Sequence, residues 1–139
     1  MKFQTLVIAM CSIAIAVPAA AAAFRAVNWL YVVPVSQDSF EVLEDRGQGA
    51  RGMWCAAADY ARAAGLYSPQ KRMYILEPRG PSRTTPNAIG VVFTTNPDDS
   101  IKDTPSSYSV TVKRKGENLL IGHAYEFCRQ PFDDVFDRF

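Results

Sequence analysis

The sequence predicts an α+β fold, an antiparallel sheet of about five to six strands with one main helix packed across a face and one disulfide. Segments rich in β-branched and aromatic residues recur between turn residues, which is typical of short strands. One alanine-rich segment has helical periodicity instead. The chain has 139 residues, of which 48% are hydrophobic and 21% charged, as expected of one folded domain rather than two. We expect that single domain to span residues 24–139.

Residues 1–23 have the pattern of a secretory signal peptide. Lys2 precedes an apolar run from Leu6 to Val17, and Pro18 ends this run before the small residues Ala19–Ala23. An uncleaved anchor is the alternative, because the apolar stretch approaches the roughly 20 residues that a spanning helix needs. Pro18 and the alanines favour cleavage after Ala23. The sequence therefore predicts a periplasmic or secreted protein with no membrane contact after cleavage.

The region after the signal is predicted to begin with a β-hairpin. Val27–Val35 and Phe40–Glu44 have strand composition and flank the turn residues Ser36-Gln37-Asp38. Pro34 has no backbone N–H to donate, which favours an edge position for the first strand. We therefore expect this hairpin at one side of the sheet.

The main helix is expected over residues 51–64, where apolar side chains recur at helical spacing. Gly65 provides a left-handed stop, and Leu66 supplies the apolar contact that accompanies such a stop. Two further strands are predicted at residues 72–77 and 88–95, with a proline-rich loop between them.

The last predicted unit is a second hairpin. Residues 108–112 alternate apolar and polar side chains, and residues 119–127 return as the partner strand after a turn at Gly116-Glu117. This register places Val112 beside Ile121 on the core face. The main helix would cover that face.

Two cysteines remain after the signal, Cys55 and Cys128, and an oxidising compartment predicts a disulfide between them. Their predicted orientations conflict with this pairing. A helical wheel places Cys55 opposite the apolar stripe, and strand alternation turns Cys128 away from the core. Either a bulge near Gly122 turns the end of the last strand, or the bond lies at the rim of the sheet.

Charge and ligand chemistry exclude several classes of partner. Lys and Arg number 15 against 14 Asp and Glu, so nothing favours a nucleic-acid partner. One histidine and two bridged cysteines cannot supply the clustered ligands of a zinc site, so we expect no metal. Residues 47–52 match the dinucleotide-binding pattern G-x-G-x-x-G. The charged residues Glu44, Asp45 and Arg46 precede it where that fold needs a buried apolar strand, so we expect no cofactor.

Four arginines are the candidate binding residues. Arg46 and Arg51 flank the start of the predicted helix, where free backbone N–H groups favour a phosphate or carboxylate. Arg79 and Arg83 lie in the proline-rich loop, where they could meet an acidic partner.

No complete catalytic set is present, so we expect a non-catalytic exported module that binds an unknown protein or a small anion. The alternative is a small thiol-dependent enzyme or redox protein. In that case Cys55 would be the nucleophile, activated near the helix start, and His123, the only histidine, would be the base. An inhibitor of another organism's enzyme also fits the size and the export signal, without support from particular residues.

Overall fold

The computed structural model describes residues 22–129. Residues 1–21 of the predicted signal peptide therefore lie outside the described residues. Within residues 22–129, no helix is long and apolar enough to cross a membrane.

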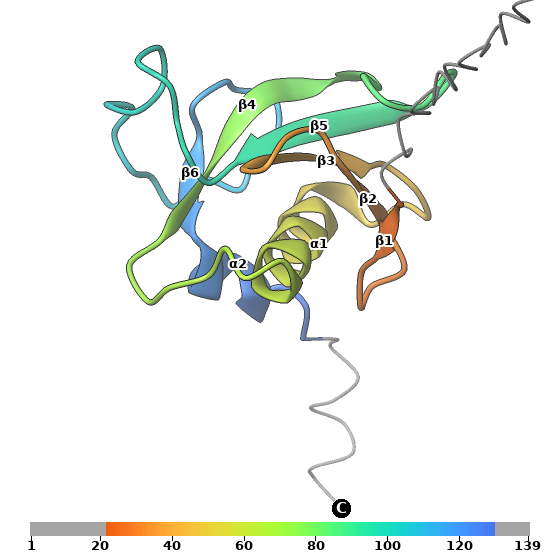
Figure 1. The fold of residues 1–139 in the computed structure, drawn as a ribbon, viewed down its shortest axis with the longest axis horizontal. Coiled ribbons are helices and arrows are strands. Elements are labelled where there is room, and N and C mark those ends of the chain that lie inside the picture. Colours follow the sequence, from red (N-terminus) through yellow and green to blue (C-terminus); the bar gives the residue numbers. More distant parts are fainter. Residues whose placement is uncertain (1–21, 130–139) are drawn as a thin grey trace, which may run out of the picture.

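The structure confirms the predicted fold class. One six-stranded sheet has the strand order β1-β2-β3-β5-β4-β6, and every neighbouring pair is antiparallel. The main helix α1 lies across one face of this sheet, and a short second helix, α2, lies beside α1 (Figure 1). The elements are β1 (Phe24–Arg25), β2 (Tyr31–Pro34), β3 (Ser39–Leu43), α1 (Gly49–Ala63), β4 (Arg72–Pro81), β5 (Ile89–Thr94), β6 (Asn118–Leu120) and α2 (Ile121–Glu126).

The first hairpin is confirmed in its pairing but not in its start. β2 and β3 pair through Val32 with Val42 and through Pro34 with Phe40. The predicted strand from Val27 is wrong in its first residues, because a turn precedes Tyr31. β1 is an additional strand outside β2, but it pairs only with Tyr31 and Val32. The outer side of Pro34 is therefore unpaired, which suits a residue that has no N–H to donate.

The main helix begins at Gly49, two residues earlier than predicted, and ends where Gly65 adopts a φ of 75°. The backbone N–H of Leu66 donates to the carbonyl oxygen of Ala61 at 2.8 Å, which closes the last turn. Toward the sheet, the rings of Trp54 and Phe93 meet edge to face with their centroids 4.9 Å apart. These contacts place the hydrophobic core between α1 and the sheet.

The predicted strand 72–77 continues as far as Pro81. Its pairing with β5 shifts register between Ile75 and Glu77, and again between Glu77 and Gly80. These irregularities accommodate Pro78, which cannot donate to a regular ladder. The other predicted strand, 88–95, is confirmed as β5, which ends one residue short of it on each side.

The second predicted hairpin is wrong. Residues 108–112 form no strand, β6 has only three residues, and residues 121–126 are helical. β6 pairs with β4, and the irregular segment before it follows β4 as well. The N–H of Arg79 donates to Val112 O at 2.8 Å, and the N–H of Ile75 donates to Glu117 O at 2.9 Å. Val112 and Ile121 are both buried, but not as partners across a hairpin.

The disulfide between Cys55 and Cys128 is confirmed, with Cα atoms 4.9 Å apart. Cys55 lies on α1 and is fully buried, while Cys128 follows the end of α2. Both explanations offered for the cysteine orientations assumed that the last segment is a strand. Because that segment is a helix packed against α1, Gly122 lies within a helix rather than at a bulge. The bond therefore joins two helices instead of lying at the sheet rim.

Candidate functional site

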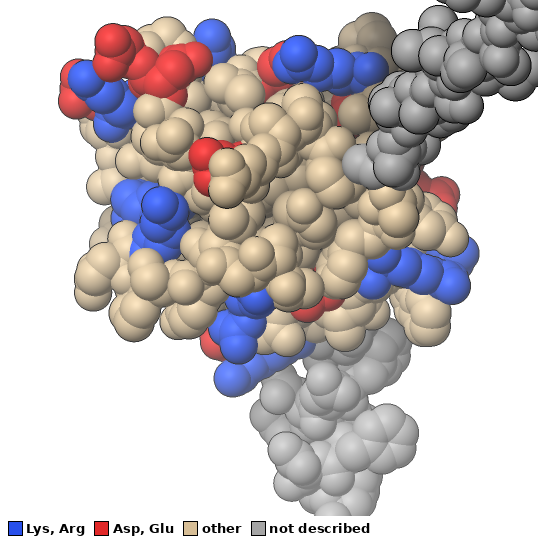
Figure 2. All heavy atoms as spheres, viewed as in Figure 1, with Lys and Arg blue, Asp and Glu red and all other residues tan. Residues whose placement is uncertain are grey.

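Three of the four candidate arginines are paired with carboxylates. Arg79 binds Glu44 through two contacts of 2.9 and 2.6 Å, and this bidentate pair raises the pKa of Arg79. Arg83 contacts Glu77 at 2.7 Å. Arg46 contacts its neighbour, Asp45, at 3.6 Å. None of these three arginines lines either of the two cavities described below, and Figure 2 shows the basic side chains of this face in separate groups.

Arg51, the fourth candidate, lines a cavity of about 320 Å³ at the start of α1. Its guanidinium carbon lies 5.4 Å from the centre of the Phe127 ring, and Gln48 makes no side-chain cap to the helix. Arg129 also lines this cavity, but it is bound to Glu126 at 3.1 Å. The predicted site at the helix start therefore contains Arg51 without Arg46.

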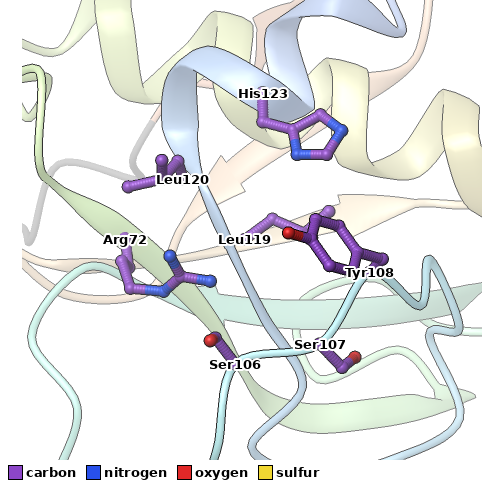
Figure 3. A pocket seen from close by; sticks show the side chains of 7 residues that line it. All are labelled: Arg72, Ser106, Ser107, Tyr108, Leu119, Leu120 and His123. Atoms are coloured by element: carbon purple, nitrogen blue, oxygen red, sulfur yellow. The ribbon is translucent and has the colours of Figure 1, made fainter.

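A second cavity, of about 200 Å³, lies where β4, β6 and α2 meet the loop before β6 (Figure 3). We call it the Arg72 cavity. Arg72 is the first residue of β4, and His123 lies on α2. The lining residues are Arg72, Ser106, Ser107, Tyr108, Leu119, Leu120 and His123.

Arg72 is held in a fixed orientation by Asn118. Its Nε donates to Asn118 Oδ1 at 2.7 Å, and its Nη2 donates to the Asn118 backbone oxygen at 3.2 Å. Asn118 is itself buried, and its Nδ2 donates to the carbonyl oxygens of Gly116 at 2.9 Å and Thr104 at 3.3 Å. Among residues 22–129, Arg72 forms no salt bridge with a carboxylate. The Arg72 guanidinium therefore faces the cavity in one orientation, with no carboxylate partner from this part of the chain.

The loop that forms the opposite wall is also anchored. Ser107 Oγ donates to the buried carboxylate of Glu117 and accepts from the Ser109 N–H at 3.1 Å. In Figure 3 the Ser107 hydroxyl points away from Arg72, whereas the Ser106 hydroxyl points toward it. Tyr108 is 94% exposed, although the backbone on both sides of it is held by these bonds.

The structure does not bring the two residues of the predicted thiol site, Cys55 and His123, to the same place. The Cys55 sulfur is bonded to Cys128, so the oxidised protein has no thiol at this position. His123 lines the Arg72 cavity, which Cys55 does not, and its ring centre lies 5.5 Å from that of Phe127. No group of three His, Cys, Asp or Glu side chains in the described part of the chain is arranged to hold a metal ion.

The candidate binding residues predicted from the sequence included neither Arg72 nor Ser106, and Tyr108 was expected in a strand rather than in a loop. The one available signal was composition, because the segment Asp103-Thr104-Pro105-Ser106-Ser107 is rich in loop-forming residues. Nothing local to Arg72 indicates that Asn118, far along the chain, would orient it.

Comparison of the chain with protein-family models, with curated proteins and with solved structures found no match in any of the three.

Proposed function

We propose that this protein is an exported, non-catalytic binding module that holds a small anion in the Arg72 cavity. The observation that carries the proposal is the Arg72 guanidinium, which is oriented by Asn118, lacks a carboxylate partner within residues 22–129 and faces a cavity.

The chemistry of the lining supports an anion. Guanidinium groups bind carboxylate and phosphate oxygens through paired hydrogen bonds, and they do so best when their orientation is set in advance. The hydroxyl of Ser106 and the imidazole of His123 add donors on other sides of the cavity. A volume of about 200 Å³ suits a small ligand rather than a polymer.

Export is supported by the N-terminal pattern and by the disulfide, since disulfides form and persist in oxidising compartments. Arg79 and Arg83 support an external acidic partner less well than Arg72 supports an anion, because Glu44 and Glu77 already neutralise their charges.

A titration with inorganic phosphate and with acetate, followed by calorimetry and amide NMR shifts, tests the proposal. Arg72→Gln should weaken binding at least about tenfold, because a charge-assisted contact is lost. Lys113→Gln, which removes an exposed charge outside the cavity, is the matched control and should bind as the unaltered protein does.

Arg51→Gln decides between the two cavities. If this variant loses the affinity and Arg72→Gln does not, the anion binds at the start of α1 and the proposed site is wrong. Binding of neither anion, up to tens of millimolar on the scale of weak small-ligand affinities, would contradict the proposal as a whole.

The thiol-dependent alternative makes a different demand, because Cys55 can act only when the bond to Cys128 is reduced. Alkylation of the exported protein under denaturing, non-reducing conditions, followed by intact mass, measures this directly. Two labels would favour the thiol alternative, and none would exclude it for the exported form. The same mass gives the signal cleavage site.

A further inference from the structure

We propose that the ligand of the Arg72 cavity is a small aromatic acid, whose carboxylate or phosphate binds Arg72 and whose flat ring packs against Tyr108. The inference rests on the proposed function, which requires only that some small anion binds. It adds the class of the ligand, and it follows from the distribution of polar and apolar side chains around the cavity (Figure 3).

The polar end of the cavity is the free side of the Arg72 guanidinium. Asn118 accepts from Nε and from Nη2, so both Nη1 hydrogens and one Nη2 hydrogen remain for a ligand. These groups lie side by side at the end of the guanidinium, in the geometry that pairs with two oxygens of one carboxylate or phosphate. The hydroxyl of Ser106, which points toward Arg72, can donate to the same group.

Apart from Ser107, whose hydroxyl is bound to Glu117, the other lining residues are apolar or aromatic. Leu119 and Leu120 line the cavity from β6, and the rings of Tyr108 and His123 also line it. Tyr108 is the most exposed large hydrophobic residue of the described chain, at 94%. Because Ser107 and Ser109 anchor its backbone, the ring is presented to the cavity mouth on a fixed loop, and almost nothing from residues 22–129 packs upon it. A planar ligand ring would cover this surface and form an aromatic pair with it.

The size of the cavity suits a ligand with one ring. A volume of about 200 Å³ corresponds to roughly seven water molecules at about 30 Å³ each, which is comparable to a single-ring acid. Acetate and inorganic phosphate would fill only the polar end.

The test uses four probes on the exported protein with its disulfide intact: benzoate, phenyl phosphate, cyclohexanecarboxylate and acetate. Benzoate should bind about tenfold more tightly than acetate, and several-fold more tightly than cyclohexanecarboxylate, which has the same carboxylate but no flat ring. Phenyl phosphate distinguishes the two oxyanions, since it shares the ring with benzoate and differs in the acid group.

Tyr108→Ala should weaken benzoate binding about tenfold and leave acetate binding unchanged, while Tyr108→Phe should retain the benzoate affinity. Because Tyr108 is almost fully exposed, neither change should affect folding, which thermal unfolding would check. Equal affinity for benzoate and cyclohexanecarboxylate, or an unchanged benzoate affinity in Tyr108→Ala, would overturn the inference. The proposed function would survive that result as long as acetate binding still required Arg72. It would fail if neither acetate nor inorganic phosphate bound, or if their binding did not require Arg72.

Discussion

Glu41 is a buried carboxylate that should be one of the largest single contributors to the stability of this fold. It lies in the middle of β3 and is 1% exposed. Its neighbours Phe40 and Val42 belong to the core beneath the sheet, so Glu41 faces the opposite side. There it holds the loop between β4 and β5. Its Oε1 accepts from the N–H of Arg83 at 2.7 Å, and its Oε2 accepts from Ser82 Oγ at 2.9 Å and from the N–H and hydroxyl of Thr84.

The stability lost when Glu41 is replaced can be estimated from these hydrogen bonds. A hydrogen bond to a charged acceptor contributes about 1.5–3 kcal/mol, and a donor left unsatisfied in the interior costs a similar amount. Glu41→Gln keeps the shape and one acceptor oxygen but places an NH2 group opposite a donor, so we expect a loss of about 2 kcal/mol in the free energy of unfolding. Glu41→Ala removes every acceptor and leaves a cavity. Because Arg83 and Thr84 are exposed enough for water to replace part of the loss, we expect about 4 kcal/mol.

Urea unfolding followed by tryptophan fluorescence measures both values, and an unchanged m-value would show that only stability has altered. The matched control is Glu44→Gln, which removes the partially exposed carboxylate that binds Arg79 and should cost less than about 1 kcal/mol. If Glu41→Gln costs no more than Glu44→Gln, the loop does not depend on the buried carboxylate and the reasoning is refuted.

Gly90 on β5 provides an independent check of the same site. A Cβ at this position would lie 2.5 Å from Glu41 Oε1 and 2.8 Å from Cδ, closer than real atoms approach. Gly90→Ala should therefore displace the carboxylate and cost about 2 kcal/mol in the unaltered protein. In the Glu41→Ala background the space is open, and the same change should cost little. Additive effects in this double-mutant cycle would contradict the predicted contact.

Three further predictions concern other parts of the fold. Replacing Cys55 and Cys128 together with serine should lower the free energy of unfolding by about 4 kcal/mol, as the chain-entropy model gives for a loop of 73 residues, measured in urea without reductant. Burial raises the pKa of Tyr60 above its ordinary value of 10.0, because the interior disfavours the charged phenolate. The folded state therefore loses stability as the pH rises above about 10, where the unfolded chain can ionise this tyrosine more easily. When the pH is raised from about 9 to about 11, the free energy of unfolding of Tyr60→Phe should fall less than that of the unaltered protein, as urea unfolding at each pH would measure. Gly65→Ala places a side chain at a φ of 75°, and thermal unfolding should show a loss of about 1 kcal/mol.

The elements that could be predicted from the sequence are those with strong local signals. The turn residues at Ser36-Gln37-Asp38 determine the pairing of β2 and β3, and the alanine-rich periodicity and Gly65 determine α1. The candidate site was harder to predict, because its geometry is not local. Arg72 was expected in a strand, as observed, but its role depends on Asn118, which reaches it only through the pairing of β4 with β6.

The last segment was predicted to be a strand but forms the helix α2. The predicted orientations of the two cysteines already pointed to this error. Ile121–Glu126 has only six residues, and a segment this short fits a strand and a helix equally well, so periodicity alone cannot decide between them. As a strand, the segment turned Cys128 away from the core while Cys55 pointed away from the sheet. A disulfide buried at Cys55 requires a second layer on the outer side of α1, and a helix supplies that layer. A helical wheel places Cys55 on the same side of α1 as the polar residue Asp59. Asp59, however, accepts a hydrogen bond from the N–H of Val27 at 2.8 Å, so this side of the helix is also in contact with the rest of the fold. A conflict between the expected disulfide and the expected orientation of its cysteines was therefore evidence for α2.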